Sequence, residues 1–206
     1  MLLKKIIYLV CILLIVSVLA CKSDHEKISI KEDDGVKVEY SQRIKDKQKD
    51  GEYNKYYASG EPFETSFFKN DSLEGERKIF YKNGTIKSIE HFHNGEYDGE
   101  FKAFFENGTT YQQGAYAKNA FQGELKTFYP NGTLKEMVTM ADNEENGPFA
   151  EYYENGVLKA QGIYKDGAKE QGELKLYARD GQLGKIMDCN DGRCKTTWKA
   201  EGFVEE

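Results

Sequence analysis

The strongest constraint on the fold of this chain is a motif that recurs every 24 residues. Six copies open on a glycine and reach a second glycine nine residues later, as in "GERKIFYKNG". The opening glycines are Gly51, Gly75, Gly99, Gly123, Gly147 and Gly172. Their spacing is 24 residues four times and then 25. A fixed period of this size indicates an array of supersecondary units that stack on their neighbours.

Each copy carries two turn signals and therefore two strands. The first is Asn-Gly or a close variant, such as Asn83-Gly84, which predicts a hairpin with a two-residue loop. The second lies eleven residues after the turn glycine and is Gly, Asn or Asp in every copy. These positions are Asp71, Gly95, Asn119, Asn143, Gly167 and Gly192. Such residues tolerate a left-handed backbone, so we expect one antiparallel hairpin in each repeat.

The repeats predict an all-β fold, namely an elongated single-layer antiparallel β-meander of about six 24-residue hairpin repeats, with about 12 to 14 strands. The composition agrees, because 26 residues are Tyr or Phe and only 3 are Pro, as in β-rich proteins. We expect a degenerate copy with Gly35 in its turn before the first repeat, and a truncated copy that ends near Trp198. The repeat domain is predicted over residues 35–200, and a tail over residues 201–206.

The predicted register assigns a role to the opening glycine. A two-residue loop at Asn83-Gly84 places Gly75 opposite Phe92, and Phe80 opposite Lys87. We therefore expect an aromatic ring on the neighbouring strand to cover each opening glycine. The candidate rings are Phe68, Phe92, Tyr116 and Tyr164. We also expect the methylene stems of Lys87, Lys135 and Lys159 to cover Phe80, Phe128 and Tyr152.

The pattern G-E-x-K-x-Y/F-Y/F-x-N-G-x-L/I-K, with a later Y-K-D-G at Tyr164 to Gly167, resembles the bacterial MORN-type variant repeat. The resemblance covers about Lys45 to Lys195. It implies an elongated antiparallel meander with one hairpin per repeat. It also implies two classes of function, because some bacterial members are labelled YwqK-like antitoxins and others serve as scaffolds near membranes. The departures are Pro148, Ala178 and an extra residue between Gly167 and Gly172.

The amino-terminal segment predicts export and lipidation. Lys4-Lys5 precede an apolar run of 15 residues, which is shorter than the span of about 20 that a bilayer requires. Residues 1–20 are therefore predicted to be a signal peptide. The "VLAC" that ends the run resembles a lipobox, which implies cleavage before Cys21 and acylation (palmitate) of that residue. The alternative is an ordinary signal peptide that carries a cysteine.

The lipobox implies a protein of the bacterial cell envelope, lipid-anchored on the periplasmic or outer face. We expect residues 21–34 to be a charged tether. Cys189 and Cys194 flank the Asp191-Gly192 turn, which places them opposite each other, and export permits a disulfide there. A zinc site is the alternative, but two cysteines without partner ligands are too few.

The sequence gives no sign of a catalytic site, a cofactor or a metal. The net charge of −6 argues against a nucleic-acid partner, which needs a basic stripe. The glutamate ladder is the same in every repeat, whereas catalysis needs one distinctive site. Its members are Glu52, Glu76, Glu100, Glu124 and Glu173. His91 and His93 could form half of a metal site, but we expect exposed strand histidines. The prediction is a non-enzymatic protein.

The candidate ligand-facing residues form an aromatic column on the more charged face of the sheet. They are Tyr56, Phe80, Phe104, Phe128, Tyr152 and Tyr177. Rings between carboxylates and ammonium groups could hold a glycan or a peptide, and the favoured alternative is that they only stabilise the sheet. The predicted function is a membrane-anchored lipoprotein that presents a repeat β-sheet for binding or scaffolding of a protein or glycan. The alternative is an antitoxin or immunity protein of a toxin–antitoxin pair.

Overall fold

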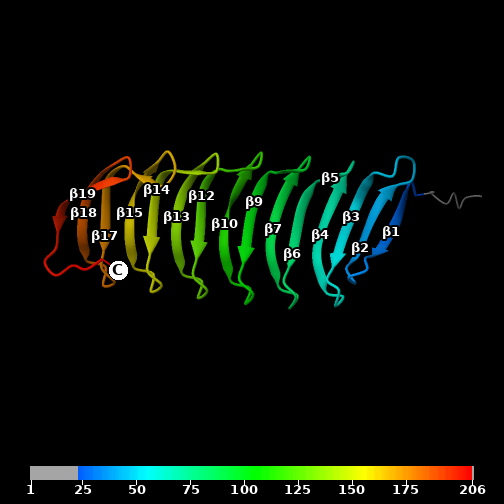
Figure 1. The fold of residues 1–206 in the computed structure, drawn as a ribbon, viewed down its shortest axis with the longest axis horizontal. Helices are drawn as coiled ribbons and strands as arrows, with labels where there is room; N and C mark the ends of the chain where they lie inside the picture. Colours follow the sequence, from blue (N-terminus) through cyan, green and yellow to red (C-terminus); the bar gives the residue numbers. More distant parts are fainter. Residues whose placement is uncertain (1–22, 206) are drawn as a thin grey trace, which may run out of the picture.

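A single open β-sheet makes up the fold. The computed structural model describes residues 23–205, and nineteen strand segments form one sheet. Every pairing is antiparallel and joins neighbours along the chain. Figure 1 shows a long ribbon that runs from β1 to β19. The predicted all-β repeat fold is confirmed, whereas the predicted signal peptide at 1–20 and Cys21 lie outside the described residues.

The strands have similar lengths and alternate with tight turns. They are β1 (His25–Lys31), β2 (Lys37–Arg43), β3 (Lys49–Tyr56), β4 (Pro62–Lys69), β5 (Ser72–Leu73), β6 (Gly75–Phe80), β7 (Ile86–His93), β8 (Glu96–Tyr97), β9 (Gly99–Phe104), β10 (Thr110–Ala117), β11 (Ala120–Phe121), β12 (Gly123–Phe128), β13 (Leu134–Ala141), β14 (Glu144–Tyr152), β15 (Leu158–Lys165), β16 (Lys169–Glu170), β17 (Gly172–Tyr177), β18 (Leu183–Asn190) and β19 (Arg193–Lys199). The two-residue segments β5, β8, β11 and β16 each continue into the next strand after a bulge. Fifteen long strands therefore remain, slightly more than the predicted number.

The amino-terminal boundary of the repeat domain differs from the prediction. The expected tether over residues 21–34 is wrong for residues 25–31, because β1 pairs with β2 along its whole length. The Glu32 amide donates to the Val36 carbonyl (2.8 Å), and Gly35 has φ +89. This turn closes a hairpin like those of the later repeats. The sheet thus begins ten residues before the predicted boundary at residue 35.

The first turn of each repeat is longer than a two-residue loop. The Tyr81 amide donates to the Thr85 carbonyl (2.9 Å), and the Gly84 amide donates to the Tyr81 carbonyl (3.0 Å). Gly84 has φ +83, whereas Asn83 is not among the residues with positive φ. This geometry is a type I turn followed by a left-handed glycine. The same five-residue turn recurs at Tyr57–Glu61, Phe105–Thr109, Tyr129–Thr133, Tyr153–Val157 and Ala178–Gln182.

The longer turn changes the cross-strand partners next to it. Phe80 lies opposite Ile86 instead of Lys87, because a bulge in β7 shifts the register by one residue. Farther from the turn, Gly75 lies opposite Phe92 as predicted. The predicted lysine contacts are therefore wrong for Lys87 and for Lys135. Their ammonium groups lie 5.8 and 6.0 Å from the ring centroids of Tyr81 and Tyr129 instead.

The second turn of each repeat is the two-residue hairpin. Asn94 (φ +51) and Gly95 (φ +83) both have left-handed backbones, as a type I′ turn requires. The same conformation occurs at Asn70-Asp71, Lys118-Asn119, Asp142-Asn143 and Asp191-Gly192. At the fifth repeat the extra residue lengthens this loop to Asp166-Gly167-Ala168, which joins Lys165 to Lys169.

The opening glycines have a backbone role. A Cβ at Gly75, Gly123 or Gly172 would meet no atom within 4 Å. At Gly51, Gly99 and Gly147 it would lie 2.9–3.0 Å from the side chains of Ser41, His91 and Thr139. The predicted rings are not the nearest neighbours of any of these glycines, so the prediction that rings cover them is wrong. Gly75 follows the bulge between β5 and β6, and its φ there is +77. This left-handed conformation is energetically unfavourable for residues that have a Cβ.

The hydrophobic core lies on one face of the sheet, which we call the inner face. Alternating residues of each strand point to it, and the strands bow in a common sense (Figure 1). Its most buried cluster spans β13 to β18 and comprises Val138, Met140, Phe149, Ala160, Leu174 and Cys189. Rings stack beside this cluster, as in the Phe149–Tyr164 pair at 3.9 Å. The opposite face, which we call the outer face, carries the glutamate ladder.

Candidate binding surfaces on the two faces of the sheet

The outer face presents the aromatic column that the sequence analysis singled out. All six rings of the column are half-buried. Beside them, a lysine and a glutamate two residues apart form ion pairs in four repeats. These are Lys78–Glu76 (2.6 Å), Lys102–Glu100 (3.9 Å), Lys126–Glu124 (2.8 Å) and Lys175–Glu173 (2.8 Å). The ladder glutamates are thus charged strand residues beside lysines, in a geometry that repeats along the sheet.

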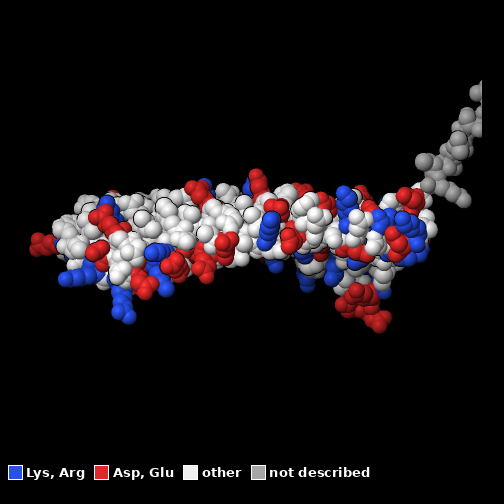
Figure 2. Space-filling model, turned by 90° about the horizontal axis from the view of Figure 1, so that it is seen from above, with Lys and Arg blue, Asp and Glu red and all other residues white. Residues whose placement is uncertain are grey.

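The two ends of this column also carry hydrogen bonds. The Tyr56 hydroxyl donates to Glu39 (3.2 Å), and burial is the largest cause that raises the pKa of Tyr56. The Tyr177 hydroxyl accepts a hydrogen bond from the Gln161 amide (2.9 Å). Figure 2 shows acidic and basic side chains interspersed along the molecule, without a stripe of one sign. On the outer face itself, the four Glu–Lys pairs place one charge of each sign beside a ring.

A second aromatic column joins successive repeats through its hydroxyl groups. The Tyr57 hydroxyl donates to the Phe80 carbonyl (2.8 Å) and the Tyr129 hydroxyl donates to the Tyr152 carbonyl (2.9 Å). Tyr81 and Tyr153 make the same bond to the repeat that follows. This link was not predicted from the sequence. The feature that could have indicated it is the tyrosine that directly precedes the first turn in four repeats.

The turn asparagines make further bonds between repeats. The Asn83 side-chain amide donates to the Glu106 carbonyl (3.2 Å), while its oxygen accepts from the Thr85 amide (2.9 Å). At the other edge, the Asn119 side chain accepts from the Tyr97 amide (2.8 Å). These turn residues therefore have a structural role at both edges of the sheet.

The inner face carries a charged group in its amino-terminal half. Arg77 lies 3.2 Å from Glu64 and 3.6 Å from Glu90. Ser66 donates to Glu64 (3.1 Å), and Ser88 donates to Glu90 (2.9 Å). Two carboxylates thus share one guanidinium, and two hydroxyls bind the remaining charge. The group is therefore an internal ion network with one excess negative charge, in which Arg77 Nε and Glu90 Oε2 are buried without a hydrogen-bond partner in residues 23–205.

The carboxyl-terminal half of the inner face is more acidic. Glu136 and Glu151 lie directly opposite each other on β13 and β14, and burial followed by the charges of Glu151 and Glu145 raises the pKa of Glu136. Burial also raises the pKa of Tyr164, and the charges of Glu151, Glu145, Glu136 and Glu170 raise it further. Only Glu151 among these acids has an ion pair in residues 23–205, with Lys159 at 3.8 Å.

A cleft of about 210 Å³ opens beside these acids. Its apolar floor includes Phe149, Ala160 and Leu174, and its rim includes Glu151 and Glu170. The carboxyl-terminal tail forms one wall with Phe203 and Glu205. The tail over residues 201–206 was predicted as a segment apart from the repeat domain, so this packing was not expected.

The tail is held against the sheet by a glycine and an ion pair. A Cβ at Gly184 would lie 2.0 Å from the Phe203 ring, so the ring rests directly on the glycine backbone. The Lys185 ammonium lies 2.5 Å from the Glu205 carboxylate. The signal for this contact was Gly184 itself, because a glycine in a strand interior often marks close packing by another group.

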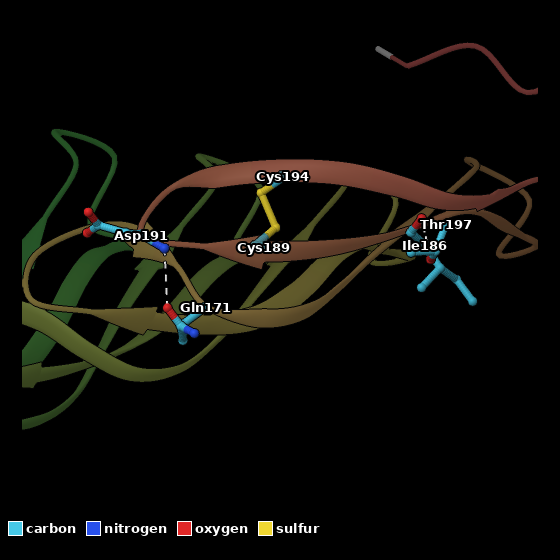
Figure 3. Close-up of a disulfide and its surroundings, with 6 residues drawn as sticks. All are labelled: Gln171, Ile186, Cys189, Asp191, Cys194 and Thr197. Atoms are coloured by element: carbon cyan, nitrogen blue, oxygen red, sulfur yellow. Dashed lines mark hydrogen bonds between the residues drawn. A yellow bond between two sulfur atoms is a disulfide. The ribbon is translucent and has the colours of Figure 1, made fainter.

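The remaining sequence candidates lie near the ends of strands. Cys189 and Cys194 are opposite each other and joined by a disulfide with an S–S length of 2.03 Å, as Figure 3 shows. His91 Nδ1 lies 2.8 Å from the Glu100 carbonyl, and His93 Nδ1 lies 3.2 Å from Glu74. Within residues 23–205, no group of three His, Cys, Asp or Glu side chains is placed to hold a metal ion.

Cys21, the candidate lipidation site, lies outside the described residues. No helix found between residues 23 and 205 has the length and apolar character that crossing a bilayer requires.

Comparison with protein families matches the chain to the MORN repeat variant. The match covers residues 49–70, 73–94, 97–118, 121–142 and 145–166, which is more than half of the chain. No curated protein matches the chain.

Two solved structures show a weak likeness to the sheet. The first is TarM, with 12% identity over 73% of this chain and a TM-score of 0.17. The chain spans only 22% of the length of TarM. The second is a porin-like protein from Bacteroides uniformis, with 11% identity, 84% of this chain and 92% of that one covered, and a TM-score of 0.22. These scores are too low to support a structural argument.

Proposed function

This chain belongs to the MORN repeat variant family, and on that premise we propose that it is a membrane-anchored, non-enzymatic lipoprotein of the cell envelope. In this proposal an acyl group on Cys21 holds the protein at the membrane. The sheet then presents an extended surface for binding or scaffolding. Acyl chains suffice for such an anchor, since each buried methylene contributes about 0.8 kcal/mol.

The observation that carries the binding role is the repetition on the outer face. Four repeats present a half-buried ring beside a Glu–Lys pair on the same strand. Repeat proteins commonly bind through extended surfaces of this kind. A ring supplies apolar contact while the flanking charges set orientation, which suits either a glycan or a polypeptide.

The anchoring part is tested by the chemistry of the mature amino terminus. Mass spectrometry of the protein expressed in bacteria should find an acylated Cys21 as the first residue. Membrane fractionation should place the protein with the membranes. The variant Cys21→Ser should lose the acyl mass and leave the membrane fraction, and a wild-type protein without lipid in the soluble fraction would refute the anchor.

The binding part is tested by crosslinking in cells. Photocrosslinking groups at Lys102 and Lys126, on the outer face, should capture a specific partner. Replacing Phe104 and Phe128 with Ala should abolish that capture, whereas the exposed Tyr111→Ala serves as a control. Capture of one stoichiometric toxic protein would favour the antitoxin alternative. Absence of any partner dependent on these rings would refute the outer face as the binding surface.

A further inference from the structure

Four acidic residues that depart from the repeat gather at one place on the inner face. Glu136 and Glu151 occupy the positions of Gln112 and Thr127 in the preceding repeat. Glu145 occupies the position of Phe121, which stacks on Tyr116 at 3.8 Å. Features that recur in every repeat are explained by the fold. An acid at the Glu136 position recurs at Glu64, where Arg77 lies 3.2 Å away. Glu136 has no such arginine, so this group of acids needs a separate explanation.

These acids destabilise the sheet as it stands. Like charges directly opposite each other across two strands are unfavourable, and Glu136 faces Glu151 in this way. The side chains of Glu136, Glu145 and Glu170 have no ion pair or hydrogen bond with any of residues 23–205. The nearby lysines are already engaged, Lys159 with Glu151 (3.8 Å) and Lys185 with Glu205 (2.5 Å).

The adjacent cleft combines this negative charge with an apolar floor. Phe149 and Leu174 are buried in the core cluster, and they line the same cleft as Glu151 and Glu170. A volume of about 210 Å³ is below the range of about 300–1,000 Å³ typical of small-molecule sites. It suits one amphipathic side chain that has an apolar stem and a cationic head.

We propose that the cleft between Phe149, Glu151 and Glu170 receives a lysine or arginine side chain of a partner protein. The methylene stem lies on Phe149 and Leu174, and the cationic head lies between the carboxylates. The charge complementarity identifies the occupant, because a cation would relieve the repulsion among the acids. This inference rests on the proposed binding role and names the chemical class of the partner.

A polypeptide fits the surroundings better than a free amine. The inner face continues away from the cleft as a row of rings, in which Tyr97, Tyr116 and Phe121 lie 4.9 and 3.8 Å apart. Residues that flank the basic side chain can lie along this row. A divalent metal is less suited, since no three metal-ligating side chains converge in residues 23–205.

The test uses the full chain in detergent micelles and blocked pentapeptides with a central Lys, Arg, Gln or Glu between alanines. Nuclear magnetic resonance titration should show that the Lys and Arg peptides shift the amide signals of β14 to β17. The Gln and Glu peptides should not. The double variant Glu151→Gln/Glu170→Gln should weaken binding by about tenfold or more, as loss of charge-assisted hydrogen bonds does.

Matched variants separate binding from folding. Glu106→Gln and Asp188→Asn remove exposed acids that do not line the cleft and should leave peptide affinity unchanged. Lys159→Gln removes a competing cation and should tighten binding, an outcome that a merely structural role for the acids does not produce. Circular dichroism should show that every variant keeps the β-sheet signal.

Three outcomes would overturn the inference. The first is an equal response to the Gln and Lys peptides, and the second is peptide binding that survives the double variant. The third is Ca²⁺ binding at these glutamates in the absence of any response to the Lys and Arg peptides. None of them would affect capture of a partner by the outer face, so failure of this inference remains distinguishable from failure of the proposed function.

Discussion

The hydroxyl of Tyr81 donates a hydrogen bond of 2.7 Å to the main-chain carbonyl of Phe104, in the next repeat. The same link recurs at Tyr57, Tyr129 and Tyr153. Phe105 occupies the equivalent position in the third repeat and has no hydroxyl. Because each repeat of such an array contacts only its neighbours, these bonds contribute directly to the coupling between repeats.

Removing one of these hydroxyls should weaken that coupling. Tyr129→Phe leaves the Tyr152 carbonyl without this donor, so we expect the free energy of unfolding to fall by about 0.5–1.5 kcal/mol. Phe105→Tyr should raise it by supplying the missing donor. Chemical denaturation measures both changes, with Tyr111→Phe as the exposed control. A loss at Tyr111 as large as that at Tyr129 would contradict the role of the hydrogen bond.

Gly75, Gly123 and Gly172 should respond to backbone conformation instead of side-chain size, because no atom lies within 4 Å of a Cβ at these positions. Gly75 has φ +77 and open space where a Cβ would lie. We expect Gly75→Ala to lower the free energy of unfolding by about 1–2 kcal/mol. Gly75→Asn should cost less despite its larger side chain, since Asn tolerates the left-handed region. The comparison is made by denaturant unfolding, and a greater cost for Asn than for Ala would point to crowding.

Loss of the disulfide should loosen the carboxyl-terminal end of the sheet. Cys189 and Cys194 are separated by five positions in the chain, and closing so short a loop is worth about 2 kcal/mol in the chain-entropy account. The double variant Cys189→Ala/Cys194→Ala should increase amide hydrogen exchange in β18 and β19. Exchange in β6 and β7 is the internal control. Equal loss of protection throughout the sheet would show that the ends are not independent.

Glu136 should make stability depend on pH. Burial and the charges of Glu151 and Glu145 raise its pKa above 4.5, so the folded state holds the proton more tightly than the unfolded chain. This contribution to stability is complete below pH 4.5 and is lost as the pH rises through the folded-state pKa. Glu136→Gln should therefore be more stable than wild type at pH 7, by about 0.2–1 kcal/mol.

The measurement is the difference between the two stability curves over pH 4 to 8, because the other carboxyl groups contribute to both. Several of these are shifted in the opposite direction. Hydrogen bonding by the Asn94 amide lowers the pKa of Glu74, for example. Glu124→Gln, on the outer face, should not reproduce the effect. A difference that grows toward acid pH would mean that Glu136 is stabilised in its charged form.

The register near the turns shows why the local sequence pattern predicted the wrong cross-strand partner for Phe80. Asn83-Gly84 can close either a two-residue loop or a five-residue turn, because both place a glycine in a left-handed conformation. The side chain of Asn83 binds the Glu106 carbonyl of the next repeat, and that contact lies 23 positions away. The choice of turn then decides whether Lys87 covers Phe80 or Tyr81.

The sequence by itself determined the period, the two turns of each repeat and the all-β class. These follow from residue type at fixed spacing, since turns and strand alternation are local properties of the backbone. Only the tertiary structure decided which turn was short, which rings stack and which acids meet at the cleft. Those relations join residues on different strands or repeats, such as Gly184 with Phe203 and Glu136 with Glu151. They depend on register and on the bow of the strands, which cooperative packing along the whole sheet establishes.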